Sequence, residues 1–242
     1  MPHVFGGRVI VLLFGAPGSG KGTQASLISK LRRIPSISTG DMLRAECRRQ
    51  SDLGTAAQAV LANGSLVDDH VVNAMVVQRI TQRDCDQGFI LDGYPRTLAQ
   101  ANFLSDFLQE VGLTELKIIH LDVPTPVLVS RLSSRRQCPA CGHIYNLLRC
   151  RPVTENRCDR DGETLVQRED DRETVVRQRL NAYRTLSAPV IKYYKGPNYY
   201  RIDGQSAPEK ISEKIQAIIN APHPHIKSTV RPRAAALYPA IE

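Results

Sequence analysis

A glycine-rich stretch over residues 15–23, GAPGSGKGT, has the residue types of a phosphate-binding loop. Glycine and lysine occupy the fixed positions of the pattern G-x-x-x-x-G-K-[ST], although Thr23 comes one residue late. A buried-strand pattern precedes it at residues 8–14 and a helical pattern follows at 24–31, which is the context that the motif requires. The backbone N–H groups of such a loop surround an anion at the positive end of the helix dipole. We therefore expect Lys21 to reach a transferred phosphoryl group and Thr23 to offer its hydroxyl to Mg²⁺.

A second group of residues has the spacing of a metal site. The pattern C-x2-C at residues 138–141 is followed, after sixteen residues, by C-x2-D at residues 158–161. Three thiolates and one carboxylate can complete a tetrahedron around zinc, and four protein ligands leave no open position for catalysis. The predicted ligands of this structural zinc are Cys138, Cys141, Cys158 and Asp161. His143 and Cys150 are alternative ligands with poorer spacing, whereas Cys47 and Cys85 are interpreted as ordinary core residues.

A third group begins at the carboxyl end of a buried strand pattern at residues 89–93. Asp92 stands at the carboxyl end of this strand, which in a phosphate-loop fold is the position of an aspartate that holds Mg²⁺. Open α/β sheets bind ligands at the carboxyl ends of their strands, so Asp92 and Arg96 are expected beside the phosphate loop. Arg44 lies just inside a helix that Ser38 or Thr39 caps, and from the residues alone it could bind a phosphate or face solvent.

These side chains require a sheet to position them. Further strands are predicted at 34–37, 116–124 and 199–203, and helices at 52–61, 69–82, 97–109, 126–134, 171–194 and 207–219. Asp68 or Asp69, and Asp170 or Asp171, are expected to cap two of these helices. The alternation predicts an α/β protein, a phosphate-loop fold of three layers (α/β/α) around a parallel sheet. His120 within a strand is interpreted as structural, and the loss of periodicity over 137–167 indicates an insertion.

Composition narrows the class of protein. The chain has 242 residues, of which 42% are hydrophobic, enough to bury a core. No apolar run approaches the roughly 18 residues of a membrane span, and the first apolar run is interpreted as a core strand rather than a signal peptide. We therefore expect a cytoplasmic protein that does not bind membranes. The net charge of +8 suits either a nucleic-acid-binding protein or an enzyme whose arginines converge on polyphosphates.

Five motifs support a family resemblance in combination. They are GAPGSGKGTQ at 15–24, STGDMLR at 38–44, LDGYPRT at 91–97, R-x3-RR at 131–136, and REDD at 168–171 with Arg179 beyond. With the cysteine pattern they make the chain resemble an adenylate kinase of the long-lid bacterial type with a zinc-bearing lid, a nucleoside monophosphate kinase, over about residues 8–219. This family reads G-K-G-T in the phosphate loop, which accounts for the late threonine.

The resemblance implies two nucleotide sites. The ATP site would comprise Gly18, Ser19, Gly20, Lys21, Gly22, Thr23, Arg131, Ile144, Tyr145 and Ser206. The AMP site would comprise Thr39, Arg44, Ser65, Leu66, Val67, Gly93, Tyr94, Pro95, Arg96 and Gln100, with Gln100 on the adenine edge and Pro95 matching a cis-proline. The catalytic cations would be Lys21, Arg96, Arg135, Arg168 and Arg179, with Asp92 and Thr23 associated with Mg²⁺. Asp170 and Asp171 would pair with arginines as the lid closes.

The resemblance also implies a division into parts. A core domain would comprise residues 1–37, 68–133 and 172–220, an AMP-binding domain 38–67, and a lid domain 134–171, the last two moving to exclude water. Residues 221–242 lie outside the resemblance, and their prolines and lack of a helical or strand period predict a mostly disordered tail. The implied protein is a monomer that binds ATP, AMP and ADP. Ser134 departs from the family at the lid hinge, where glycine is frequent, and Ser206 replaces a frequent lysine.

Two alternatives to an adenylate kinase remain from the sequence. A related kinase could use another monophosphate or GTP, although Thr39 and Gln100 favour adenine at the acceptor site. A zinc-ribbon protein could bind nucleic acid through its basic surface. Against the latter, the basic residues fall at loop, lid and helix-start positions, and few aromatic residues are available for base stacking. We therefore expect no nucleic-acid partner.

Overall fold

A five-stranded parallel sheet forms the centre of the computed structural model, which describes residues 8–63, 65–113 and 115–221. Its strands are β1 (Val9–Phe14), β2 (Ser36–Ser38), β3 (Gly88–Asp92), β4 (Leu116–Asp122) and β7 (Tyr199–Asp203), in the order β2-β3-β1-β4-β7. The α-helices are α1 (Lys21–Arg32), α2 (Thr39–Arg49), α3 (Asp52–Ala62), α4 (Asp69–Ile80), α5 (Leu98–Glu110), α6 (Thr125–Ser133), α7 (Glu173–Tyr194) and α8 (Pro208–Asn220). The predicted strands and helices are confirmed to within a few residues.

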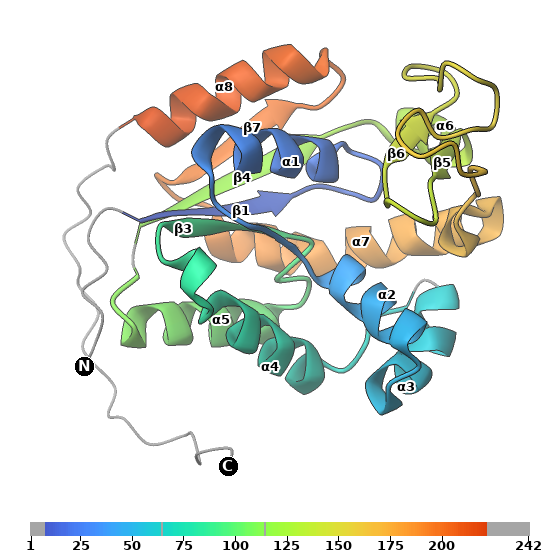
Figure 1. Cartoon of the computed structure of the whole chain (residues 1–242). Coiled ribbons are helices and arrows are strands. Elements are labelled where there is room, and N and C mark those ends of the chain that lie inside the picture. The colour runs from blue at the N-terminus through green and yellow to red at the C-terminus, as the bar shows by residue number, and fades with distance from the viewer. Residues whose placement is uncertain (1–7, 64, 114, 222–242) are drawn as a thin grey trace.

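Helices cover both faces of the sheet, which confirms the predicted three-layer α/β/α fold. In β1, the side chains of Ile10, Leu12 and Phe14 pack against α4, α5 and α7, whereas Val11 and Leu13 pack against α1 and α8. This alternation follows from the two-residue period of a strand. Because both faces are buried, β1 is apolar along its whole length. Figure 1 shows α1 and α8 on one side of the sheet and α4 and α5 on the other.

Two segments extend from these layers. Helices α2 and α3 pack on each other beyond the β2 edge of the sheet (Figure 1). Between α6 and α7, the chain forms a lobe with a two-stranded antiparallel sheet of β5 (Arg135–Gln137) and β6 (Ile144–Asn146). The sequence predicted an insertion here but no strands, because strands of three residues in a turn-rich segment have no detectable period.

The start of α7 differs from the prediction. Asp170 and Asp171 do not cap this helix: they lie in a 3₁₀ turn, η2 (Glu169–Asp171), and α7 begins at Glu173 after Arg172, which makes no side-chain cap. The two carboxylates pair with arginine side chains instead. An ionised carboxylate gains more from a guanidinium than from a single backbone N–H group, so the ion pairs compete successfully with the cap.

Other predictions concern the ends of the chain and single residues. The predicted tail lies outside the described residues except for Ala221. Among the described helices, none is both long and apolar enough to cross a membrane. His120 is structural, as predicted, because its Nδ1 lies 2.5 Å from the hydroxyl of Tyr199 and its Nε2 lies 3.2 Å from that of Tyr183. These contacts join β4 to β7 and α7.

Candidate nucleotide and metal sites

The phosphate loop connects β1 to α1 at the carboxyl edge of the sheet. Gly15 and Gly20 have φ angles of 149° and 100°, which side-chain-bearing residues rarely adopt. A Cβ atom on Gly15 would also lie 2.7 Å from the carbonyl oxygen of Leu121. No side chain caps α1, so its first N–H groups remain open to an anion.

Lys21 folds back over this loop. Its Nζ donates to the carbonyl oxygens of Gly15, at 2.7 Å, and Ala16, at 3.1 Å. Burial lowers the pKa of Lys21 to about 8; Asp92 opposes the decrease, and nearby arginines, Arg96, Arg179 and Arg135, add to it. The neighbouring positive charges that lower this pKa would also stabilise a bound anion at the same place.

Asp92 approaches the loop from the neighbouring strand. It pairs in register with Leu13 of β1 and Ser38 of β2. A Cβ atom on Gly22 would lie 3.6 Å from its Oδ2, so the carboxylate is next to the first turn of α1. Burial raises the pKa of Asp92, and Lys21 and Arg96 oppose the increase. Asp92, Gly22 and Asp41 line an open pocket of about 550 Å³, in which carboxylate oxygens could serve a hydrated cation.

Polar contacts hold the predicted acceptor residues beside β3. Thr39, the first residue of α2, donates to the carbonyl oxygen of Gly93 at 3.2 Å, and Nε of Arg96 donates to the same oxygen at 2.7 Å. The peptide bond between Tyr94 and Pro95 is cis, as the resemblance implied. Ser38 caps α2, and Arg44 lies in the second turn of this helix.

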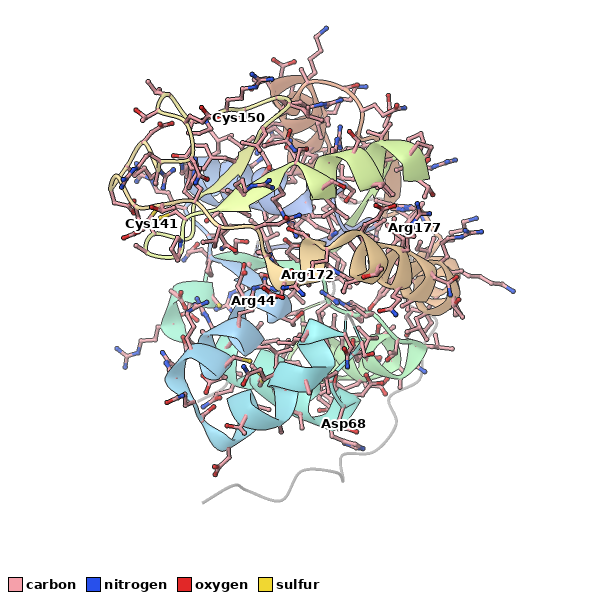
Figure 2. All side chains as sticks on the ribbon, turned by 90° about the vertical axis from the view of Figure 1, so that its right-hand side faces the viewer. Arg44, Asp68, Cys141, Cys150, Arg172 and Arg177 are labelled. Carbon is pink, nitrogen blue, oxygen red and sulfur yellow. The ribbon has the colours of Figure 1, made fainter. Side chains whose placement is uncertain are left out.

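Arg44 faces the η2 turn. It pairs with Asp41 and interacts electrostatically with Arg168 and Asp170. Figure 2 shows Arg44 between α2 and the start of α7, where Arg172 is labelled. Burial lowers the pKa of Arg44, and Arg168 adds to the decrease. Arg44, for which the sequence left phosphate binding and solvent exposure open, therefore lies among the charged residues Asp41, Arg168 and Asp170.

Three arginines meet two aspartates where the lobe joins α7. Arg135 is bidentate to Asp171, with distances of 2.7 and 2.5 Å, and Arg168 is bidentate to Asp170, with distances of 2.9 and 2.6 Å. Arg179 lies 3.0 Å from Asp170 and 3.4 Å from Asp171. Burial opposes ionisation of Asp170, but Arg179 and Arg168 hold its pKa at about 2. Burial lowers the pKa of Arg179 to about 10, with Asp170 opposing the decrease.

The residues predicted for the ATP base lie beside the phosphate loop and on the lobe. Arg131 donates to the carbonyl oxygen of Gly204 at 2.8 Å, two residues before Ser206. Ile144 is exposed on the lobe. The side chain of Tyr145 is buried in the lobe, where its hydroxyl accepts from the N–H of Asp159 at 2.8 Å, so this side chain faces away from a nucleotide.

The remaining predicted acceptor residues lie between α3 and α4. Ser65 is exposed, Leu66 is half-buried, and Val67 packs against the core beneath β1. The structure therefore brings Asp92, Arg96, Arg135 and Arg179 into electrostatic range of Lys21, while it leaves Ile144 and Ser65 open to solvent.

Sequence reasoning missed the role of Asp69. The residue was predicted only as a helix cap, but Asp68 caps α4, and Asp69 accepts a hydrogen bond from the side chain of Gln100 at 2.7 Å. When two aspartates stand side by side before a helix, the sequence does not show which of them caps the helix and which turns inward. The inward partner here is Gln100 of α5, so the outcome depends on where α5 packs.

The predicted metal ligands gather at one point of the lobe. The ligand atoms of Cys138, Cys141, Cys158 and Asp161 all lie within 4.8 Å of one another. The sulfurs of Cys141 and Cys158 are 3.6 Å apart, and Sγ of Cys138 is 3.3 Å from a carboxylate oxygen of Asp161. A tetrahedral zinc with Zn–S bonds of about 2.3 Å requires sulfurs about 3.8 Å apart. The donor set therefore fits zinc.

Neither alternative metal ligand belongs to this group. His143 stacks edge-on against Tyr145, with ring centroids 4.7 Å apart, and Cys150 is exposed. Cys85 is buried, as expected of a core residue, and Cys47 is partly buried.

Comparisons with known proteins agree on one family. The family model for adenylate kinase matches residues 13–199. The adenylate kinase of Pseudothermotoga lettingae is 47% identical over 186 residues, which are 77% of this chain and 86% of that protein. The adenylate kinase of Thermosipho melanesiensis is 44% identical over 86% of this chain and 98% of its own length, and that of Archaeoglobus fulgidus is 42% identical over 86% and 97%.

Proposed function

The chain belongs to the adenylate kinase family of phosphotransferases, and we propose that it transfers a phosphoryl group reversibly between MgATP and AMP, giving two ADP. The observation that carries this proposal is the convergence of cations around Lys21. Arg96, Arg135 and Arg179 come from three separate elements, and each of them lowers the pKa of Lys21. Such a cluster suits the charge spread over a transferred phosphoryl group.

The proposed division of labour follows the two sides of the cleft. On the donor side, Gly18 to Thr23 hold the ATP phosphates through backbone N–H groups, and Arg131 lies against the base. Ile144 and the backbones of Tyr145 and Ser206 contribute further contacts. On the acceptor side, Arg44 and Arg96 hold the AMP phosphate, because guanidinium groups match phosphate oxygens. Thr39, the 65–67 segment and the 93–95 segment shape the pocket, and Gln100 contacts the adenine edge.

Catalysis by this arrangement depends on positioning and charge neutralisation. Lys21 contacts the transferred phosphoryl group, while Arg135, Arg168 and Arg179 stabilise the oxygens of that group. In the described structure these arginines already pair with Asp170 and Asp171, so phosphates would replace or share existing carboxylate partners.

Two metals accompany the proposal. Mg²⁺ arrives with ATP and supplies charge neutralisation; Asp92 and Thr23 would hold it, which fits the position of Asp92 beside Gly22. Zn²⁺ would be held by Cys138, Cys141, Cys158 and Asp161 and would stabilise a lobe whose apolar cluster consists of only a few side chains.

We also propose the three-part division of the chain. The core comprises residues 1–37, 68–133 and 172–220, the AMP-binding part 38–67 and the lid 134–171, and closure of the last two would exclude water from the reaction. The protein would act as a monomer.

The proposal is tested by ADP formation from MgATP with AMP, UMP, CMP or GMP in parallel. We expect rapid turnover with AMP alone and about one zinc per chain, since one metal-ligand group is present in the described residues. A preference for another monophosphate would contradict the acceptor assignment. Absence of turnover with all four, in folded protein, would contradict the proposed function.

A further inference from the structure

Gln100, which the proposed function places on the adenine edge of AMP, is itself held in place by the protein. Only 2% of this residue is exposed. Its Oε1 accepts a hydrogen bond from the backbone N–H of Arg96 at 2.8 Å, and its Nε2 donates to Oδ1 of Asp69 at 2.7 Å. Both ends of the amide group therefore have a partner before any nucleotide binds.

Asp69 is itself held in place by a hydrogen bond to a second residue. Its second oxygen, Oδ2, accepts from the hydroxyl of Thr97 at 2.6 Å, and Thr97 in turn caps α5. One turn further along α4, Asn73 accepts from the buried hydroxyl of Tyr94 at 2.6 Å. Two successive turns of α4 thus hold the segment that leads into Gln100, and α4 packs beside α5 (Figure 1).

These contacts allow only one orientation of the Gln100 amide. An ionised carboxylate accepts hydrogen bonds and cannot donate them, so Nε2 must face Asp69. A backbone N–H only donates, so Oε1 must face Arg96. Rotating the amide by 180° would bring its oxygen against a carboxylate and its NH₂ against an N–H. Both new contacts are repulsive and leave buried polar atoms unpaired.

The orientation matters for the base that is read. After these contacts, Oε1 keeps one lone pair and Nε2 keeps one N–H for a ligand. Adenine presents a donor at its 6-amino group and an acceptor at N1, which complement that pair. A 6-oxopurine presents an acceptor at position 6 and a donor at N1, which would require the rotated amide.

We propose that Asp69 is a specificity-determining positioning residue, which selects 6-aminopurine over 6-oxopurine monophosphates by fixing the orientation of Gln100. The inference rests on the proposed function, because it takes Gln100 as a contact of the acceptor base. A site built from buried, oriented polar groups discriminates strongly against a ligand that leaves those groups unpaired.

The test compares AMP with inosine monophosphate as acceptors in the Asp69→Asn variant. The new side chain has nearly the same shape, but it can turn its NH₂ toward a rotated Gln100, so that only the backbone N–H of Arg96 still opposes the rotation. We expect the ratio of kcat/KM for AMP to that for inosine monophosphate to fall about tenfold, the order of one buried hydrogen bond. The change should appear in the KM values for the monophosphates, while the KM for ATP stays unchanged.

Two variants serve as matched controls. Asp68→Asn removes a charge from the same helix start, but asparagine caps as well as aspartate, and Asp68 is exposed (Figure 2). It should leave the ratio unchanged. Thr97→Val removes the other hydrogen bond of Asp69 and should lower the melting temperature without changing the ratio. If Asp69→Asn does not fold, Asp69→Ser also lacks the carboxylate and replaces it.

The outcomes separate this inference from the proposed function. An unchanged ratio in a folded Asp69 variant would overturn the positioning role. So would an equal loss of activity with both monophosphates, since that indicates a structural role alone. A wild-type protein with no preference for AMP would instead overturn the acceptor assignment itself.

Discussion

At the scale of single residues, charge distinguishes the candidate site from the rest of the surface. Lys21 and Arg179 both have lowered pKa values, because they are buried close to other cations. Asp170 has a lowered pKa for the opposite reason: it faces Arg179 and Arg168. Like charges held together in this way favour binding of an anion that neutralises them.

The pKa of Lys21 predicts how ATP binding depends on pH. Bound phosphates favour the charged amine and should raise its pKa above the value of about 8 in the free protein. Below pH 7 the lysine is charged in both states, so affinity is constant. Above pH 8 binding must take up a proton, and affinity should fall by up to about tenfold per pH unit. Titration calorimetry in buffers of different ionisation enthalpy measures this uptake.

The matched variant for this prediction is Lys21→Arg, whose guanidinium stays charged across the range. Its binding should take up less than about half as many protons at pH 9 as the wild type. Equal proton uptake by the two proteins would assign the pH dependence to another group.

Arg96 is predicted to serve the acceptor rather than the donor. Replacing Arg96 with alanine removes a charge-assisted contact, so the KM for AMP should rise about tenfold or more, while the KM for ATP changes less than about twofold. Steady-state kinetics with each substrate varied in turn gives both values. Arg177→Ala is the control, because Arg177 pairs with Glu173 on the outer face of α7, away from the cleft (Figure 2). Equal increases in both KM values would contradict the assignment.

At the scale of secondary-structure elements, the core and the lobe are stabilised differently. The central strands bury apolar side chains on both faces, and their boundaries follow from hydrophobic runs and turn residues. The lobe has only Cys138, Tyr145, Cys158 and Leu165 in its buried cluster, two of which are predicted metal ligands. We therefore expect its fold to depend on the proposed zinc more than on apolar packing.

Loss of one metal ligand should destabilise the lobe without changing the reaction catalysed. In Cys138→Ser, zinc content should fall from about one per chain toward zero, and the melting temperature should fall by about 5–10 °C. Elemental analysis and calorimetry on one sample measure both. Cys150→Ser is the control, because Cys150 is exposed and lies outside the ligand group. Full zinc content in Cys138→Ser would contradict the ligand set.

At the scale of the whole molecule, ion pairs connect the lobe to the core. Asp171 is fully buried and joins Arg135 of β5 to Arg179 of α7. These contacts cross from the proposed lid to the longest helix of the core. Because the same arginines are proposed to bind phosphates, we expect substrate binding and the attachment of the proposed lid to be coupled through this aspartate.

Removing Asp171 should therefore cost stability. Asp171→Asn leaves Arg135 without a bidentate carboxylate partner, and the free energy of unfolding should fall by about 2–3 kcal/mol, somewhat below the value for a fully buried pair because the arginines are partly exposed. Denaturant unfolding measures the change. Glu173→Gln, which breaks the exposed pair with Arg177, should cost less than about 1 kcal/mol. Similar losses in both variants would show that the buried network has no special role.

The sequence alone determined the sheet, the phosphate loop and the cluster of predicted metal ligands. These features depend on local patterns: apolar runs for the strands, glycines beside a lysine for the loop, and paired C-x2-C and C-x2-D spacings for the metal group. These features can be predicted from the sequence because each depends only on a few neighbouring residues or on burial of apolar side chains.

Only the tertiary structure decided which partners the charged and amide side chains take. Asp171 forms ion pairs instead of capping α7, Asp69 accepts a hydrogen bond from Gln100 while Asp68 caps α4, and the side chain of Tyr145 turns into the lobe. Each outcome depends on residues distant in the chain, whose approach is set by helix packing. A polar side chain takes the partner that compensates best for its burial, and a sequence does not show which groups will be within reach.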